Sequence, residues 1–206
     1  MLINIKKRWC VIILISAIIA AVWGTGRAEM ARYDVDPDHS SVEFRVAHMV
    51  VSKTTGRFTD YTGFIEMDVD TQKVTALEAV IKTASVNTGH EKRDNHLRGD
   101  DFFKVEKYPT MTYKMKSYHK AGENYEVIGD LTLLGITKEI MLVGGFNGAT
   151  KDPWGNLRAG FTAEGKINRK DFGMDWNKIL DNGGLVVGDD VFIKLDIECI
   201  QAKPKN

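Results

Sequence analysis

The stretch "SVEFRVAH" (Ser41–His48) alternates between two kinds of side chain. Val42, Phe44, Val46 and His48 share one parity, and the residues between them are polar or small. A two-residue period of this kind is typical of a β-strand with one face in a core and the other in water. The stretch therefore predicts a strand, and the same period recurs along much of the chain.

Four further stretches, residues 64–69, 111–116, 161–168 and 191–199, also alternate. The side chains on their apolar parity are Ile65, Met67, Val69, Met111, Tyr113, Met115, Phe161, Ala163, Gly165, Ile167, Val191, Ile193, Leu195 and Ile197. Turn signals such as "AGEN", "LLGI" and "DNGG" separate the predicted strands at short intervals. The runs "VTALEAVIKTASV" and "ITKEIMLVGGF" alternate poorly, so their inner faces stay unassigned.

From residue 32 onward the pattern predicts about eight strands, most of them paired with their neighbours in sequence. Such a series with one wet face indicates an antiparallel meander. Closing the meander into a barrel removes its exposed edges. The expected fold is therefore all-β, an extended eight-stranded antiparallel barrel formed by one domain over residues 29–206.

The inward parity predicts a hollow barrel. An eight-stranded barrel either fills its interior with side chains or leaves room for one ligand. Ala163 and Gly165 lie between Phe161 and Ile167, and such small inward residues favour a cavity, although Gly165 also fits a bend or bulge. Each candidate lining residue is also compatible with a plain core role; the candidates are Val42, Phe44, Val46, Met111, Tyr113, Met115, Phe161, Ala163, Ile167, Val191, Ile193, Leu195 and Ile197.

The first residues are typical of an export signal. "MLINIKKRW" places basic side chains ahead of the apolar run "CVIILISAIIAAVW", and small residues follow at Gly26 and Ala28. The apolar run is shorter than the roughly 20 residues that a membrane-spanning helix needs. We therefore predict a signal peptide over residues 1–28, cleaved after Ala28, with an uncleaved anchor as the alternative.

The charge of the predicted mature chain excludes some classes of binding partner, and its cysteine content bears on disulfide formation. Residues 1–28 contain four basic and no acidic side chains, which leaves 24 of the 28 Lys and Arg residues against 28 Asp and Glu, a net charge of −4. This charge argues against a nucleic-acid partner and disfavours an anionic membrane surface. Cys199 then stands alone, on the apolar parity of its strand, so we expect a buried thiol without a disulfide.

The charged stretch "SVNTGHEKRDNHLRGDDFF" (residues 85–103) raises the question of a metal or catalytic centre. A metal site needs ligands that meet at one point, and residues three or four apart share a helix face. His90 and Asp94 have that spacing, but His96 is six residues beyond His90 and lies off the face. We therefore predict no metal site and no catalytic residue here.

The same stretch suits a short helix between two strands. Good helix formers follow Glu91, and Leu97, Phe102 and Phe103 supply an apolar side. We expect this helical excursion to cap one end of the barrel with its apolar side inward and its charges in water. Side chains at such an entrance can meet a polar head group; the candidates are Arg93, His96, Arg98 and His48, the last of which also fits a buried histidine bonded to a backbone carbonyl.

Five segments in order resemble the YceI-like family, lipocalin-like bacterial proteins that bind polyisoprenoids. They are "HSSVEFRVAHM", "GRFTDYTGFIEMD", "ASVNTGHEKRDNHLRGDDFF" with "KYPTMTY", "GDLTLLGITKEI" and "DPWGNLRAGFTAEGKINRKDFGM". The resemblance extends from about Tyr33 to about Ile200. In the last segment we expect a turn at "DPWG", with Trp154 packed against the barrel end, and a structural corner at residues 171–173.

The resemblance implies a lipocalin-like barrel whose long apolar pocket holds a polyprenyl chain, in a protein exported to the periplasm. The expected partner is a hydrophobic lipid with an isoprenoid tail, and the lipid itself is the only bound group expected, with no other cofactor. Two alternatives stay open. One is an enzyme that modifies such a lipid with His48 or the His90–His96 segment as acid or base. The other is a binding module for an inner-membrane partner, with transient membrane contact. Parity does not separate an exposed apolar stripe from a lining stripe, so the oligomeric state also stays open.

Overall fold

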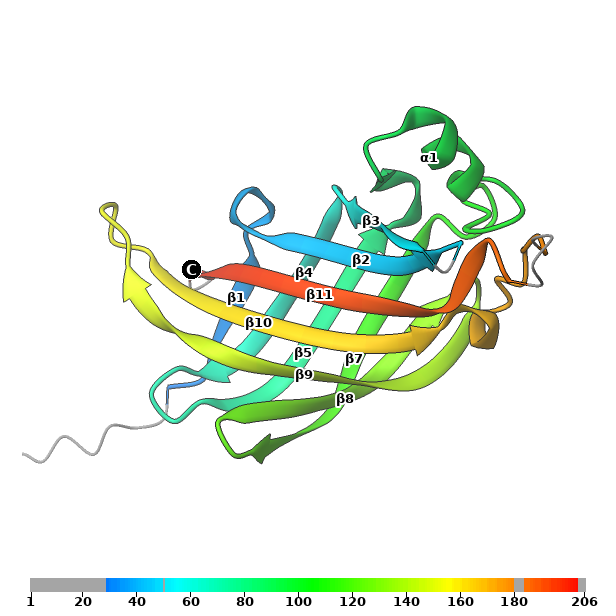
Figure 1. Cartoon of the computed structure of the whole chain (residues 1–206). Coiled ribbons are helices and arrows are strands. Elements are labelled where there is room, and N and C mark those ends of the chain that lie inside the picture. Colours follow the sequence, from blue (N-terminus) through cyan, green and yellow to red (C-terminus); the bar gives the residue numbers. More distant parts are fainter. Residues whose placement is uncertain (1–28, 50, 180–183, 204–206) are drawn as a thin grey trace, which may run out of the picture.

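The computed structural model describes residues 29–49, 51–179 and 184–203, and over this part of the chain it is one antiparallel β-sheet with a single α-helix (Figure 1). The predicted signal peptide lies outside the described residues. The strands are β1 Ala31–Val35, β2 Ser41–His48, β3 Ser52–Phe58, β4 Tyr61–Asp68, β5 Lys73–Lys82, β6 Val86–Asn87, β7 Thr110–Ala121, β8 Asn124–Leu133, β9 Ile136–Lys151, β10 Leu157–Asn168 and β11 Val187–Gln201. The helix α1 is Glu91–Arg98, and the short 3-10 turns are η1 Pro37–His39, η2 Thr83–Ser85 and η3 Arg169–Phe172.

Eight of these strands close into a barrel, as predicted. The hydrogen-bonded order is β1-β4-β5-β7-β8-β9-β10-β11, and β11 returns to β1 through the pair Val35 and Cys199. Further toward its start, β11 pairs along the same edge with β2, as in the pair Asp196 and Ser41. β1 and β2 thus share one edge of β11 and are separated by η1. β3 and β6 then extend the sheet from β2 toward α1.

β-Bulges explain why some strands alternate poorly in sequence. Thr75 of β5 has no partner, because Ala76 pairs with Glu66 and Val74 pairs with the next residue of β4. A single extra residue moves the following side chains to the other face, so Val74 and Leu77 both face inward although their parities differ. On β7, Lys116 is the extra residue. In β9 the period holds up to Phe146, where a bulge at Asn147 follows, but it is hidden because outward Met141 and Val143 are also apolar and exposed.

Two clusters of buried side chains lie toward the two ends of the barrel. The cluster around β1 includes Tyr33, Met67 and Cys199. The other cluster lies on the side of α1 and includes Val86 and Phe172. Cys199 is completely buried and unpaired, as expected, and burial raises the pKa of its thiol to about 12.

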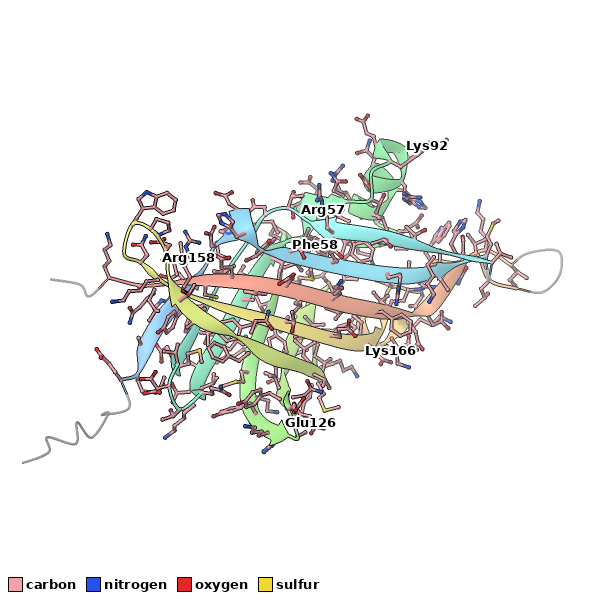
Figure 2. All side chains as sticks on the ribbon, turned by 60° about the vertical axis from the view of Figure 1, so that its left-hand side comes forward. Arg57, Phe58, Lys92, Glu126, Arg158 and Lys166 are labelled. Atoms are coloured by element: carbon pink, nitrogen blue, oxygen red, sulfur yellow. The ribbon has the colours of Figure 1, made fainter. Side chains whose placement is uncertain are left out.

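The β9–β10 hairpin projects from the end of the barrel opposite α1, where Figure 2 shows Arg158 far from Lys92. The predicted turn is present, but the prediction that Trp154 packs against the barrel is wrong, because its side chain is 80% exposed. The Asp152 carboxylate accepts hydrogen bonds from the backbone N–H groups of Trp154 and Asn156, at 3.0 and 2.8 Å. These bonds fix the turn without help from the indole ring. Within the described part of the chain, no helix is both long and apolar enough to span a lipid bilayer.

Candidate binding cavity

The barrel encloses a cavity of about 470 Å³. The structure brings all thirteen side chains proposed from parity to its wall, from β2, β7, β10 and β11; they are Val42, Phe44, Val46, Met111, Tyr113, Met115, Phe161, Ala163, Ile167, Val191, Ile193, Leu195 and Ile197. Their contact with a ligand stays a prediction. Phe44 reaches its place because β3 has Gly56 beside it, where a Cβ atom would come within 2.3 Å of the Phe44 ring.

Sequence reasoning missed much of the wall. No lining residue was proposed from β4, β5, β8 or β9. These strands contribute among others Phe64, Ile65, Leu77, Ala79, Val127 and Leu142. The part of β5 after its bulge, residues 77–81, does alternate, so a search that allowed one inserted residue would have found its inner face. Trp176 and Arg169 also line the cavity from the segment between β10 and β11, and no strand period marks them.

The buried polar side-chain groups of the wall are already paired with the protein. The hydroxyl of Tyr113 donates to the carbonyl of Val127 at 3.0 Å, and that of Tyr61 donates to Ser40 at 2.7 Å. Burial raises the pKa of both phenols, which keeps them protonated and neutral. Among the described residues, no buried side-chain nitrogen or oxygen lacks a hydrogen-bond partner. The wall therefore favours an apolar ligand, because a polar ligand would find few free hydrogen-bonding groups.

Three of the four head-group candidates line the cavity beside α1: His48, Arg93 and His96. Arg93 donates through Nε to the Thr88 hydroxyl at 2.7 Å and through Nη2 to the Thr88 carbonyl at 3.0 Å. His96 lies 2.7 Å from an Asp101 oxygen, and its ring meets the Trp176 ring edge-on at 4.9 Å. Cationic and neutral donors thus stand at one end of a largely apolar wall. The helix caps this end of the barrel as predicted, and Phe102 and Phe103 are buried beneath it.

Arg98 lies outside the cavity wall, and we therefore leave it out of the candidate head-group contacts. Its guanidinium donates to the carbonyls of Ala84 and Val86 at 2.8 and 2.9 Å. These bonds tie α1 to η2 and β6. The sequence could not distinguish this structural use from ligand contact, because both require a long cationic side chain on the same short helix.

Arg169 anchors the segment between β10 and β11, which contributes to the cavity wall at the end near α1. Its buried guanidinium donates to the carbonyls of Met174, Trp176 (2.9 Å) and Gly188 (2.9 Å). Burial lowers the pKa of this guanidinium, and the nearby carboxylate of Asp189 opposes that effect. Because Trp176 is among the residues held, Arg169 fixes the position of an indole ring in the cavity wall.

Away from α1, β5 and β7 stop pairing beyond Glu78 and Lys114, and tyrosines close the gap. The backbone N–H of Val74 on β5 donates to the hydroxyl of Tyr118 on β7 at 3.0 Å. The hydroxyl of Tyr125 donates to the side chain of Gln72, and the two tyrosine rings lie 6.0 Å apart. Gln72 and both tyrosines line the cavity, so hydrogen bonds made by side chains close the wall where strand pairing ends.

A group of possible metal ligands lies near β1 rather than in the cavity wall. One ligand atom each from Asp36, His39 and Glu198 lies within 4.8 Å of the others. The guanidinium of Arg158 stands among them, 2.8 Å from Asp36 and 3.0 Å from Asp152, and also bonds Glu198. Since Arg158 already supplies the positive charge, this group is an ion-pair network. Hydrogen bonds from Asn156 and then Arg158 lower the pKa of Asp152 to about 2.

Comparison with known proteins places this barrel in a family. The family model of the YceI-like domain matches residues 33–199, which include every strand of the barrel except the ends of β1 and β11. The chain belongs to the YceI-like family. A UPF0312 protein of Yersinia pestis (strain Pestoides F) is 38% identical over 186 residues, covering 89% of this chain and 94% of the relative. A UPF0312 protein of Pectobacterium carotovorum is 37% identical over 170 residues, covering 82% and 88%.

Three solved structures have the same fold. The Campylobacter jejuni YceI protein is 37% identical, with a TM-score of 0.66 over 76% of this chain and 90% of that chain. BcnA of Burkholderia cenocepacia is 22% identical, with a TM-score of 0.67 over 80% and 98%. A polyisoprenoid binding domain from Saccharophagus degradans, implicated in plant cell wall breakdown, is 17% identical, with a TM-score of 0.58 over 84% and 100%. At such low identity the last two show the fold alone.

Proposed function

We propose that this YceI-like protein binds a polyisoprenoid or an isoprenoid-tailed lipid, with the tail inside the barrel, and carries or stores it in the periplasm. The observation that carries the proposal is the closed barrel around an apolar cavity of about 470 Å³. That volume falls in the range of about 300–1,000 Å³ that is usual for small-molecule pockets. The Saccharophagus domain, described as polyisoprenoid binding, adds support from a shared fold.

The chemistry of an isoprenoid tail matches the wall. Such a tail has no hydrogen-bonding group, and the buried side-chain nitrogen and oxygen atoms of the described residues are already paired within the protein. Moving the roughly five carbons of one isoprene unit out of water is favourable by about 4 kcal/mol, at about 0.8 kcal/mol per carbon. Methionine and aromatic side chains such as Met111, Met115 and Phe161 adapt to a bent, methylated chain.

The head group would lie beside α1, where His48, Arg93 and His96 meet the cavity. Arg93 favours an anionic or strongly polar head, because a guanidinium bonds phosphate and carboxylate oxygens well. Binding of this kind needs no catalytic group, and we propose none. Periplasmic location rests on the export signal predicted for residues 1–28.

Solvent extraction tests the function directly. The mature protein, purified from its native host without detergent, is extracted with organic solvent, and the extract is analysed by mass spectrometry. We expect an isoprenoid series at about one molecule per chain. An extract free of lipid, from protein whose circular dichroism is that of an intact β-barrel, would count against the carrier. Turnover of the lipid that is lost in His48→Ala while binding is kept would favour the enzyme alternative.

A further inference from the structure

Two hairpins at the α1 end of the barrel carry large apolar side chains that face solvent. Val51, in the β2–β3 turn, is 82% exposed, and Met49 precedes it with 40% exposed. Ile179, in the segment between η3 and β11, is 79% exposed, and Leu185 is also exposed. Branched apolar side chains at this exposure forgo most of the free energy that burial would supply. A cluster of them indicates an interaction surface.

Backbone hydrogen bonds join these two hairpins into one tip. The N–H of Met49 donates to the carbonyl of Val186 at 2.9 Å, and the N–H of Val186 donates to the carbonyl of Lys178 at 3.0 Å. Ile179 and Leu185 face each other across a β-bridge. In Figure 1 the described parts of both segments lie at the end of the barrel that carries α1. We call Met49, Val51, Ile179 and Leu185 the apolar tip.

The apolar tip borders the mouth of the cavity. His48 and Val186, each next in sequence to a member of the tip, line the cavity wall. The side chains of Lys53 and Lys178 are exposed beside the tip. Apolar side chains flanked by basic ones suit the boundary between acyl chains and lipid phosphates. The chain as a whole is not basic, so this attraction is local to the tip.

We propose that the apolar tip inserts into the surface of a phospholipid bilayer and brings the mouth of the cavity against the membrane. This inference rests on the proposed function, because its purpose is to let an apolar tail pass between bilayer and barrel without crossing water. Projecting hairpins with apolar ends and lysine flanks fit a lipid surface better than a protein groove. The mouth would then open toward the acyl chains, with Arg93 and His96 at the level of the phosphates.

Vesicle flotation of the full mature protein tests the proposal. The probes are protein-free vesicles of phosphatidylcholine, alone or with phosphatidylglycerol. We expect the wild type to float with both and more strongly with phosphatidylglycerol. Val51→Asp with Ile179→Asp should weaken binding by at least about tenfold, since each apolar side chain would lose its partial burial. Lys53→Gln with Lys178→Gln should remove the preference for phosphatidylglycerol.

The control is Trp154→Asp, which places one aspartate at an equally exposed aromatic residue on the opposite end of the barrel. It should float as the wild type does. Cavity binding, measured in parallel with a polyprenol delivered from ethanol, should be equal in the wild type, in Val51→Asp with Ile179→Asp and in Trp154→Asp. The tip proposal is overturned if the wild type binds the polyprenol but does not bind vesicles. It is also overturned if Val51→Asp with Ile179→Asp floats as the wild type does. Neither outcome contradicts the proposed lipid-binding function. If the wild type floats only with native membranes that contain protein, the occupant is a protein and the proposal is again overturned.

Discussion

Ala79→Phe would reduce the room for an isoprenoid tail from inside the barrel. Ala79 lies on β5 with its side chain in the cavity wall, and its neighbours across the ladder are Gly63 and Tyr113. The added phenyl ring is about the size of one isoprene unit. Displacing one unit removes up to about 4 kcal/mol of burial, which is about a thousandfold in Kd. A tail that shifts along the cavity would recover part of this, so we expect a loss of at least about tenfold.

Two controls separate blockage from damage to the fold. Val80→Phe adds the same ring one residue away on the outer face of β5, where the side chain is already exposed, and should bind normally. Ala163→Phe adds the ring on β10, on the opposite side of the strand ring, and should also weaken binding. Overpacking of the wall would cost about 1–3 kcal/mol of stability, which a urea titration would reveal.

The assay is a titration with polyprenols of graded length, followed through the quenching of tryptophan fluorescence, since Trp176 lines the cavity. In Ala79→Phe the longest chains should lose the most affinity, and short chains should bind nearly as they do in the wild type. Equal Kd values for wild type and Ala79→Phe at every length, with both proteins folded, would refute the assignment of the tail to this cavity.

Three further outcomes follow from the contacts. Arg169→Met leaves the carbonyls of Trp176 and Gly188 without their donor, so urea denaturation should show a loss of about 3 kcal/mol; a loss below 1 kcal/mol would contradict the anchoring role. Asp152 has a pKa lowered to about 2, so Asp152→Asn should be less stable than the wild type above about pH 4, and thermal melts should converge as the pH falls through 2; a gap unchanged at pH 2 would argue against the ion-pair network. His48→Ala should weaken binding of a polyprenyl phosphate about tenfold but leave a polyprenol unaffected; equal losses for both ligands would remove His48 from the head-group site.

The strands with unbroken alternation could be predicted from sequence, side chain by side chain. In β2, β10 and β11 every proposed inward residue reaches the cavity wall, because a strand turns each second side chain to the same face. The inner face of β5 could not be assigned from sequence, because Thr75 adds one residue and reverses the parity. A bulge is a property of two paired strands, so one strand's sequence does not reveal it.

Individual polar and aromatic residues were harder to place than strands. Arg93 and Arg98 are near neighbours on one helix, yet Arg93 lines the cavity and Arg98 binds carbonyls of η2 and β6. Trp154 was expected to pack against the barrel but is exposed. The Asp152 carboxylate accepts a hydrogen bond from its backbone N–H, so the turn does not depend on packing of the indole ring. In each case the partner that decides the placement is a backbone group or a tertiary neighbour, which a pattern of residue types does not encode.

β11 pairs with β10 on one side and with both β1 and β2 on the other, so the barrel closes only when this last strand is in place. During synthesis, therefore, the earlier strands can form only an open sheet whose apolar face is exposed to solvent. We expect stable folding to await the final fifteen-residue strand. If the export signal predicted for residues 1–28 directs the chain through a translocation pore, such a delay would help, because the chain would stay unfolded until β11 has crossed.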